Sequence, residues 1–229
     1  WCKTPCPAPL PSPLCRGSCR RLRVLVLSKA GLVYLANPKT ASQAIRAMLA
    51  PHSSSAEVSR DHPHMNAAIF ARRFARTVQV AIGRPPETFA VMREPLEHMH
   101  SWYRYRQRDA LRGHPNSTHG ISFAEFVEAR LADPQPPFAA IGRQDRFLGH
   151  LGGGPPVTHI FDYARMERMV AFLSTRLEVP LTLGERNISP KGSDAPDLPA
   201  PLMARFRAAH GTEFDLYAKV AAKGHLISR

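Results

Sequence analysis

The chain has 229 residues, long enough for one substantial hydrophobic core and short for two, so we expect a single domain. The 44% of hydrophobic residues form no apolar run of membrane-spanning length, since the longest candidate, residues 23–36, is broken by Ser28, Lys29 and Gly31. With 31 Lys and Arg against 18 Asp and Glu, the net charge of +13 favours anionic partners such as nucleic acid, acidic polysaccharide or a nucleotide. A composition bias of the source genome explains this charge equally well, and 8% aromatic residues argue against an RNA-stacking surface.

The cysteines are confined to the start of the chain, in two C-x3-C pairs separated by a Pro-rich spacer: Cys2, Cys6, Cys15 and Cys19. A zinc knuckle or two disulfides is one interpretation, although this spacing is unusual for zinc and no histidine is near. A disordered lead-in over residues 1–21 is the other, and we favour it. Residues 22–229 would then form the folded domain. The chain begins with Trp1 and not Met, which leaves open whether it is complete at its start.

The first predicted elements are two strands joined by a tight turn, over residues 22–27 and 31–36, where aliphatic and aromatic residues are concentrated. Pro38 ends the second strand. A helix is expected from near Ser42, because apolar residues then recur at helical spacing. The local order is therefore strand, polar loop, helix.

The same order follows once more. Residues 67–78 have the apolar stripe of a helix, and the apolar run 88–92 is typical of a buried strand. A helix is predicted to begin near Pro95, since proline is favoured at the first helical position. This second strand also delivers a short loop directly into a helix.

The second half is expected to contain a helix from residue 123 capped by Ser122, a brief strand over 157–161, a helix over about 166–177 and one or two helices over 201–222. Strands that alternate with helices indicate an α/β fold. We therefore predict a single domain with a mostly parallel central sheet flanked by helices.

Two loops at predicted strand ends carry candidate anion-binding residues. In the sequence PKTASQAI, Lys39 and small or hydroxyl residues lie just before a helix N-terminus, where backbone N–H groups and the helix dipole favour phosphate or sulfate. In MREPLEHMHS, Arg93 follows a strand directly and Ser101 lies two helical turns further on. An ordinary βα turn with a surface lysine, and a salt-bridged surface arginine, are the structural alternatives.

These motifs resemble those of sulfotransferases, most closely the carbohydrate-type enzymes and their bacterial relatives. PKTASQ is similar to their 5′-phosphosulfate loop, usually PK-[ST]-[AG]-[ST]-[ST], and RxPxxxxxS is similar to their 3′-phosphate motif. FDYARMERM, RNIS and FRAAHGTEFDLYAKV resemble later segments of the family, so the likeness extends over residues 22–222. The resemblance implies a P-loop-like nucleotide site for 3′-phosphoadenosine 5′-phosphosulfate (PAPS), without a required metal.

The resemblance also implies roles for individual residues. Lys39 would contact the sulfuryl group and the bridging oxygen, and the 5′-phosphate would be held by Thr40, Ala41, Ser42 and Gln43. Arg93 and Ser101 would hold the 3′-phosphate. Two departures from the family pattern are Gln43, which replaces a hydroxyl residue, and Glu94, which replaces a frequent asparagine and is tolerable only if it points away from the anion.

Sulfuryl transfer needs a base for the acceptor hydroxyl. By the resemblance this base is a histidine ahead of the 3′-phosphate motif, which predicts His64, with His62 as the second choice. Solvated loop histidines are the alternative. No metal site is predicted from His98, His100, His114 and His119, which we expect at the surface or in an acceptor groove. Arg104, Arg106 and Arg108 are expected to face an acidic acceptor such as a glycan, or else to form a solvated helix face.

The sequence thus predicts a PAPS-dependent sulfotransferase. Its predicted partner is a hydroxyl-bearing acceptor, a carbohydrate, and not nucleic acid. A nucleotide-binding homologue without turnover, a basic nucleic-acid-binding module and a P-loop kinase are the rival hypotheses; the last lacks the Walker A pattern. The absence of a signal-peptide pattern favours the cytoplasm for a bacterial protein, whereas an excised eukaryotic catalytic domain would belong to the Golgi lumen.

Overall fold

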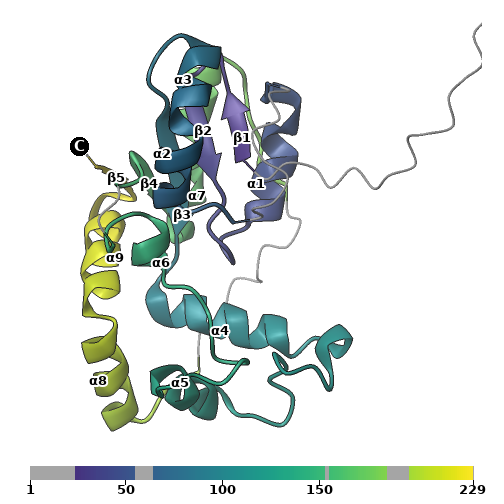
Figure 1. Ribbon diagram of the computed structural model, residues 1–229, viewed down its shortest axis with the longest axis vertical. Coiled ribbons are helices and arrows are strands. Elements are labelled where there is room, and N and C mark those ends of the chain that lie inside the picture. Colours follow the sequence, from purple (N-terminus) through teal and green to yellow (C-terminus); the bar gives the residue numbers. More distant parts are fainter. Residues whose placement is uncertain (1–23, 55–63, 153–154, 185–195, 229) are drawn as a thin grey trace, which may run out of the picture.

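The computed structural model describes residues 24–54, 64–152, 155–184 and 196–228 (Figure 1). Its centre is a five-stranded sheet in which the spatial order of the strands follows the chain. The strands are β1 (Val24–Leu27), β2 (Leu32–Leu35), β3 (Glu87–Met92), β4 (His159–Asp162) and β5 (His225–Ile227).

Nine α-helices and three short 3-10 helices accompany these strands in the described residues. The α-helices are α1 (Ser42–Leu49), α2 (Ala67–Arg73), α3 (Ala75–Ile82), α4 (Pro95–Arg106), α5 (Phe123–Leu131), α6 (Gln144–Phe147), α7 (Met166–Leu177), α8 (Ala200–Ala209) and α9 (Gly211–Lys223). The 3-10 helices are η1 (Ala50–His52), η2 (Asp109–Leu111) and η3 (Tyr163–Arg165).

The sheet is mixed, which corrects the prediction of a mostly parallel one. β2, β3 and β4 run parallel, while the two edge strands β1 and β5 pair antiparallel with their neighbours. β1 must be antiparallel because only a tight turn, with Gly31 at φ +68°, joins it to β2, and a parallel pair needs a long crossover. The carboxyl ends of β2, β3 and β4 therefore meet at one edge of the sheet.

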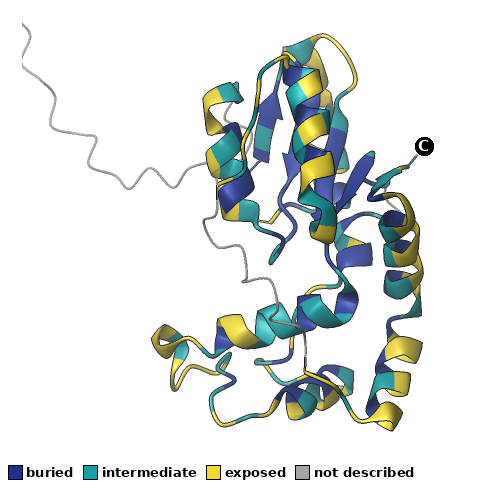
Figure 2. Cartoon of the chain, turned by 180° about the vertical axis from the view of Figure 1, so that it is seen from behind, coloured by how far each residue is buried: buried dark blue, intermediate teal, exposed yellow. Residues whose placement is uncertain are grey.

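Two layers of helices cover the sheet, as the α/β prediction requires. One face, with Val33 and Ala90, packs against α2, α3 and α9, and the other, with Tyr34 and Phe89, packs against α1 and α7. Figure 2 shows strands β1 to β4 largely buried, the edge strand β5 partly exposed and the outer helix faces exposed. Alternate residues of each strand enter different core clusters because strand side chains point to opposite faces in turn.

A third apolar cluster lies beyond the carboxyl edge of the sheet, where α4, α5 and α8 pack together around Met99, Phe126 and Phe206 (Figure 1). α5 begins with a capping box, in which Ser122 and Glu125 satisfy each other's backbone N–H groups, as the predicted cap requires. This helical layer faces the strand ends and supplies one wall of the candidate site.

Most predicted elements are confirmed, and α7 has the predicted bounds. The single helix predicted over residues 67–78 is divided by Phe74, whose backbone (φ −128°, ψ −23°) leaves the helical region between α2 and α3. α6 and β5 were not predicted, because a four-residue helix and a three-residue strand carry no usable periodicity.

Candidate functional site

The loop after β2 carries the predicted phosphosulfate motif and adopts an uncommon backbone. Lys39 (φ 64°) and Ala41 (φ 54°) both lie in the left-handed region, which residues other than glycine enter at an energetic cost. These residues turn the chain sharply into α1. Ala41 caps that helix without a side-chain hydrogen bond, so the first N–H groups of α1 have no side-chain acceptor at the cap. Such a terminus favours an anion.

The loop is held from its inner side. Thr40 has no exposed surface, and its hydroxyl donates to the carbonyl oxygen of Asn37 at 2.9 Å. The buried Asn37 side chain donates in turn to the carbonyl oxygen of Val91 in β3 at 3.0 Å. Thr40 therefore shapes the loop from within and is the one member of the predicted phosphate set that does not line the cavity described below.

The loop after β3 presents Arg93, which is only 6% exposed. Its Nε donates to Glu97 at 3.1 Å, and its guanidinium lies over the Tyr163 ring at 4.6 Å from the centroid. Glu94 accepts a hydrogen bond from the backbone N–H of Glu97 at 2.7 Å and so caps α4. Glu94 does not line the cavity. Its carboxylate is therefore kept away from the predicted anion, as the sequence required.

Both loops open into one cavity of about 1010 Å³ at the carboxyl edge of the parallel strands. The predicted site residues on its wall are Lys39, Ala41, Ser42, Gln43, His64, Arg93 and Ser101. The rest of the wall is Pro38, Arg46, Trp102, Arg104, Tyr105, Arg108 and Tyr163. Residues far apart in the sequence thus share one basic cavity with four positively charged arginines and a lysine.

Lys39 is a cation on this wall whose surroundings disfavour its charge. Its Nζ lies 4.1 Å from the centroid of the Tyr105 ring and 5.8 Å from that of Trp102. Burial lowers the pKa of Lys39 to about 8, and the positive charges of Arg108 and Arg93 add to the effect. A desolvated lysine among arginines is poised to gain from an incoming anion, which would supply the missing negative charge.

His64 lies beside the same loop. Its Nδ1 is 3.0 Å from the carbonyl oxygen of Ala36, the residue after β2. A carbonyl only accepts, so Nδ1 carries the proton, and in the neutral ring the lone pair is on Nε2. A base at this position would therefore act through Nε2. His62, the second choice, lies outside the described residues, as do the four cysteines and RNIS.

The three arginines expected to face an acceptor divide into two groups. Arg104 and Arg108 line the cavity, and the Arg108 guanidinium lies 4.7 Å from the Tyr105 ring centroid. Arg106 does not: it is 7% exposed and donates to the carbonyl oxygens of Pro137 and Ala140 at 2.8 and 3.3 Å. The prediction is wrong for Arg106, because that side of α4 packs on the segment that follows α5.

A buried glutamine that the sequence did not single out joins the two loops. The side-chain oxygen of Gln144 accepts from the Arg93 N–H at 3.0 Å and from Asn37 Nδ2 at 3.1 Å. Its Nε2 donates to the Arg93 carbonyl oxygen at 2.8 Å. The Gln144 amide thus pairs with both backbone groups of Arg93, in the way that the backbone of a neighbouring strand pairs with a residue in a sheet. Gln144 thus fixes the backbone of Arg93 and ties it to the Lys39 loop.

Gln144 is itself held by Glu213 of α9. Glu213 Oε1 accepts from the backbone N–H and the Nε2 of Gln144 at 3.1 and 3.2 Å, and Oε2 accepts from His210 Nδ1 at 2.9 Å. Hydrogen bonds from His210 and Gln144 hold the pKa of Glu213 below its usual value despite its burial. A lone glutamine in a polar segment gives no periodic signal, so sequence reasoning could not have found this network.

His98 was expected at the surface or in an acceptor groove, but it is 3% exposed, and that expectation is wrong. Its Nε2 donates to the Pro38 carbonyl oxygen at 3.1 Å, and burial lowers its pKa to about 4, so the ring is neutral. His98 thereby supports the Lys39 loop from α4. Its spacing from Pro95 and Trp102 places it on the inward stripe of that helix, a signal that was available in the sequence.

No helix among the described residues is long and apolar enough to cross a membrane. In the same residues no group of three or more His, Cys, Asp and Glu side chains is arranged to hold a metal ion. A scan against protein-family models finds no match for this chain, and a search of the curated proteins finds no relative.

Proposed function

We propose that this protein is a PAPS-dependent sulfotransferase that moves a sulfuryl group to a hydroxyl of a carbohydrate acceptor. One observation carries the proposal: Lys39 and Arg93, from the ends of two adjacent parallel strands, open into one cavity together with His64. Two cationic positions and a base in one cavity are what a donor with an anionic group at each end and a hydroxyl acceptor need.

The residues on the wall fit the two ends of PAPS. Lys39 and the N-terminus of α1 suit the phosphosulfate, since an ammonium and the residues that begin α1 lie on the same cavity wall. Arg93 and the Ser101 hydroxyl suit the 3′-phosphate, for which a guanidinium offers a planar fork of donors. A cavity of about 1010 Å³ has room for a nucleotide and for part of an acceptor.

The donor supplies a sulfuryl group whose S–O bond to phosphate breaks as the acceptor oxygen bonds to sulfur, with 3′,5′-adenosine bisphosphate leaving. His64 Nε2 takes the proton of the acceptor hydroxyl, because its Nδ1 is engaged with Ala36. Lys39, still mostly protonated at pH 7 with a pKa of about 8, neutralises the charge that accumulates on the departing phosphate.

Arg104 and Arg108 on the cavity wall favour an acceptor that carries acidic groups. The aromatic Trp102 and Tyr105 side chains line the cavity beside them and add apolar surface that a sugar can contact. An acidic glycan combines both properties and is the acceptor class that we propose.

A nucleotide-binding homologue without turnover is a second candidate, and Gln43 is the observation that favours it. Gln43 lines the cavity at the position where the 5′-phosphosulfate loop of sulfotransferases usually has a hydroxyl residue, so one donor to the 5′-phosphate would differ. Binding of the nucleotide together with an absence of transfer to any acceptor would identify this second function.

The test is transfer of radiolabelled sulfur from PAPS to a panel of neutral and acidic saccharides, with His64→Ala and the surface control His114→Ala. We expect His64→Ala to lower kcat by about 10²-fold or more and to leave the affinity for 3′,5′-adenosine bisphosphate within about twofold of the wild type. His114→Ala should retain wild-type kcat. Equal rates for the wild type and His64→Ala would contradict the assignment of the base.

A further inference from the structure

A second basic cavity lies apart from the first, between the end of α5, the segment before α6 and the junction of α8 with α9. Its volume is about 430 Å³. It shares no residue with the first cavity, and its wall consists of Arg130, Leu131, Gln135, Ile141, Gly142, Arg143, Arg146, Ala209 and His210. Three arginines around one small cavity are unusual, because like charges repel unless an anion separates them.

Arg130 is the central observation. It is only 7% exposed, and no described residue accepts a hydrogen bond from its buried Nε. Neither nearby carboxylate accepts a hydrogen bond from this Nε, and Glu213 accepts instead from Gln144 and His210. A buried guanidinium without an acceptor is costly. Because the Nε itself is closed off from solvent, an anion in the cavity would reach the Arg130 charge through the terminal nitrogens, for which no described residue is an acceptor either.

The second nearby carboxylate is occupied in the same way. Asp145 Oδ1 accepts from Arg143 Nε at 3.1 Å and from the Arg146 N–H at 2.7 Å, and Oδ2 accepts from Arg143 at 2.6 Å and from Thr212 at 2.5 Å. Arg143 is thereby fixed in place. Asp145 therefore neutralises Arg143 and leaves the charges of Arg130 and Arg146 to the cavity.

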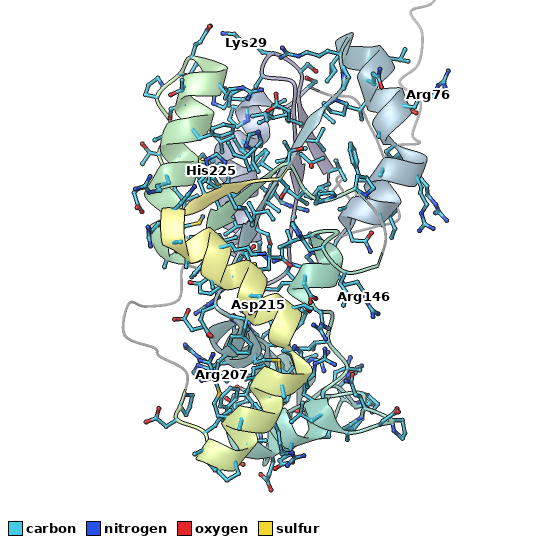
Figure 3. The ribbon with its side chains drawn as sticks, turned by 90° about the vertical axis from the view of Figure 1, so that its left-hand side faces the viewer. Lys29, Arg76, Arg146, Arg207, Asp215 and His225 are labelled. Atoms are coloured by element: carbon cyan, nitrogen blue, oxygen red, sulfur yellow. The ribbon has the colours of Figure 1, made fainter. Side chains whose placement is uncertain are left out.

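Arg146 supplies a second available cation. It lies on α6 at the surface beside α9, as Figure 3 shows, and its side chain pairs with no acid in the part of the chain that the structure describes. The three arginines face two carboxylates, Asp145 and Glu213, so the cavity has an excess of positive charge even if His210 is neutral. Two guanidinium groups converge here from α5 and α6.

We propose that this cavity binds an oxyanion, the sulfate or phosphate ester group of a molecule of about monosaccharide size, between Arg130 and Arg146. Guanidinium forks match the oxygens of such groups. A volume of about 430 Å³ exceeds what a bare ion fills, given that a water molecule occupies about 30 Å³, which favours an ester over a free ion. The site does not depend on the proposed sulfotransferase function.

The test uses Lys39→Ala/Arg93→Ala protein, in which the first cavity has lost two cations, and follows the arginine Nε–H signals by ¹⁵N NMR. Glucose 6-phosphate, inorganic phosphate and glucose are titrated separately. The variants Arg130→Met and Arg146→Ala are added in this background, with Arg76→Ala, on the outer face of α3, as the matched control (Figure 3).

We expect glucose 6-phosphate to shift the Arg130 Nε–H signal and to bind about tenfold more weakly in Arg130→Met and in Arg146→Ala than in Arg76→Ala. Arg130→Met should also raise the melting temperature in anion-free buffer, because it removes a buried charge that has no acceptor. Equal binding of inorganic phosphate would identify a free ion as the ligand of the same site. An unshifted Arg130 signal, or affinities unchanged in both variants, would overturn the proposal, whatever the nucleotide affinity of the wild type.

Discussion

The two ends of the parallel strands use charge in opposite ways. At the amino end, Arg176 donates to both oxygens of Glu87 at 2.9 and 3.0 Å, and His159 Nε2 lies 2.7 Å from the same carboxylate. At the carboxyl end, Lys39 has aromatic rings as neighbours and pairs with no acid of the described residues. The charges at the amino end are paired with one another, whereas the carboxyl end has an excess of positive charge.

The pKa values show the same contrast. Hydrogen bonds from Arg176 lower the pKa of Glu87 to about 2, so ionisation of Glu87 stabilises the fold. Burial lowers the pKa of Lys39 to about 8, so its protonation opposes folding, and its left-handed backbone adds strain. A charge kept at the expense of stability marks a ligand site more reliably than a charge that is already paired.

The largest effect is expected from Gln144→Leu, which tests whether the carboxyl end depends on its buried support. The variant leaves the Arg93 N–H and carbonyl groups buried without partners. We expect a loss of about 2–4 kcal/mol in the free energy of unfolding, measured by urea denaturation. Gln79→Leu, at an exposed position of α3, should change it by less than about 0.5 kcal/mol. A loss no larger than that of the control would contradict the role of Gln144.

The next prediction concerns pH and the Lys39 charge. An anion binds the protonated lysine, so affinity for 3′,5′-adenosine bisphosphate should fall as the pH rises through about 8. Between pH 7 and 9 the dissociation constant should increase about tenfold, or about 1.4 kcal/mol. Lys39→Arg keeps its charge and should remove this dependence. An identical pH profile for the two proteins in calorimetric titrations would show that Lys39 does not contact the anion.

At the opposite end, Glu87→Gln should affect stability and leave ligand binding unchanged. The Glu87 side chain is 42% exposed, so we expect a loss of only about 1 kcal/mol above pH 4.5. The loss should shrink as the pH falls from 4.5 toward 2, because wild-type Glu87 then becomes protonated too. Asp215→Asn, an exposed acid of α9, is the control in thermal denaturation (Figure 3). Weaker nucleotide binding by Glu87→Gln would break the contrast between the two ends.

The smallest effect is expected from His98→Gln in mild acid. The pKa of His98 is about 4 in the folded protein and about 6.5 when unfolded, so the unfolded chain takes up the proton and stability falls as the pH drops from 6.5 to 4. Glutamine retains a donor for Pro38. The variant should flatten the fall of the unfolding free energy with decreasing pH by an amount that corresponds to the uptake of less than one proton on unfolding. His225, whose pKa is also lowered to about 4 by burial, keeps part of the slope. A slope as steep as that of the control His114→Gln would mean that His98 is not buried as a neutral ring.

Local patterns in the sequence predicted much of this fold. Apolar spacing predicted the bounds of α7, and Pro38 and Pro95 marked the transitions at which the two candidate loops occur. The antiparallel edge strand β5 was missed because three residues are too few for a pattern. Phe74, at which residues 67–78 divide, packs against the core on one face of the sheet, a contact that local propensity does not report.

The candidate site was predictable in its parts and not in its assembly. Lys39, Arg93 and His64 could be named because strand ends and short motifs mark them. That Gln144 joins the loops, or that Arg106 turns away from them, depends on contacts between segments about 30 or more residues apart, which no single-sequence pattern encodes.

Calorimetric titration of the wild type, Lys39→Ala and Arg93→Ala with 3′,5′-adenosine bisphosphate tests the central claim most directly. We predict that the wild type binds the nucleotide and that each variant binds it at least about tenfold more weakly, about 1.4 kcal/mol or more, while Glu87→Gln binds like the wild type. Absence of binding by the folded wild type, or equal affinities in all four proteins, would contradict the claim that the carboxyl end of the sheet is a nucleotide site.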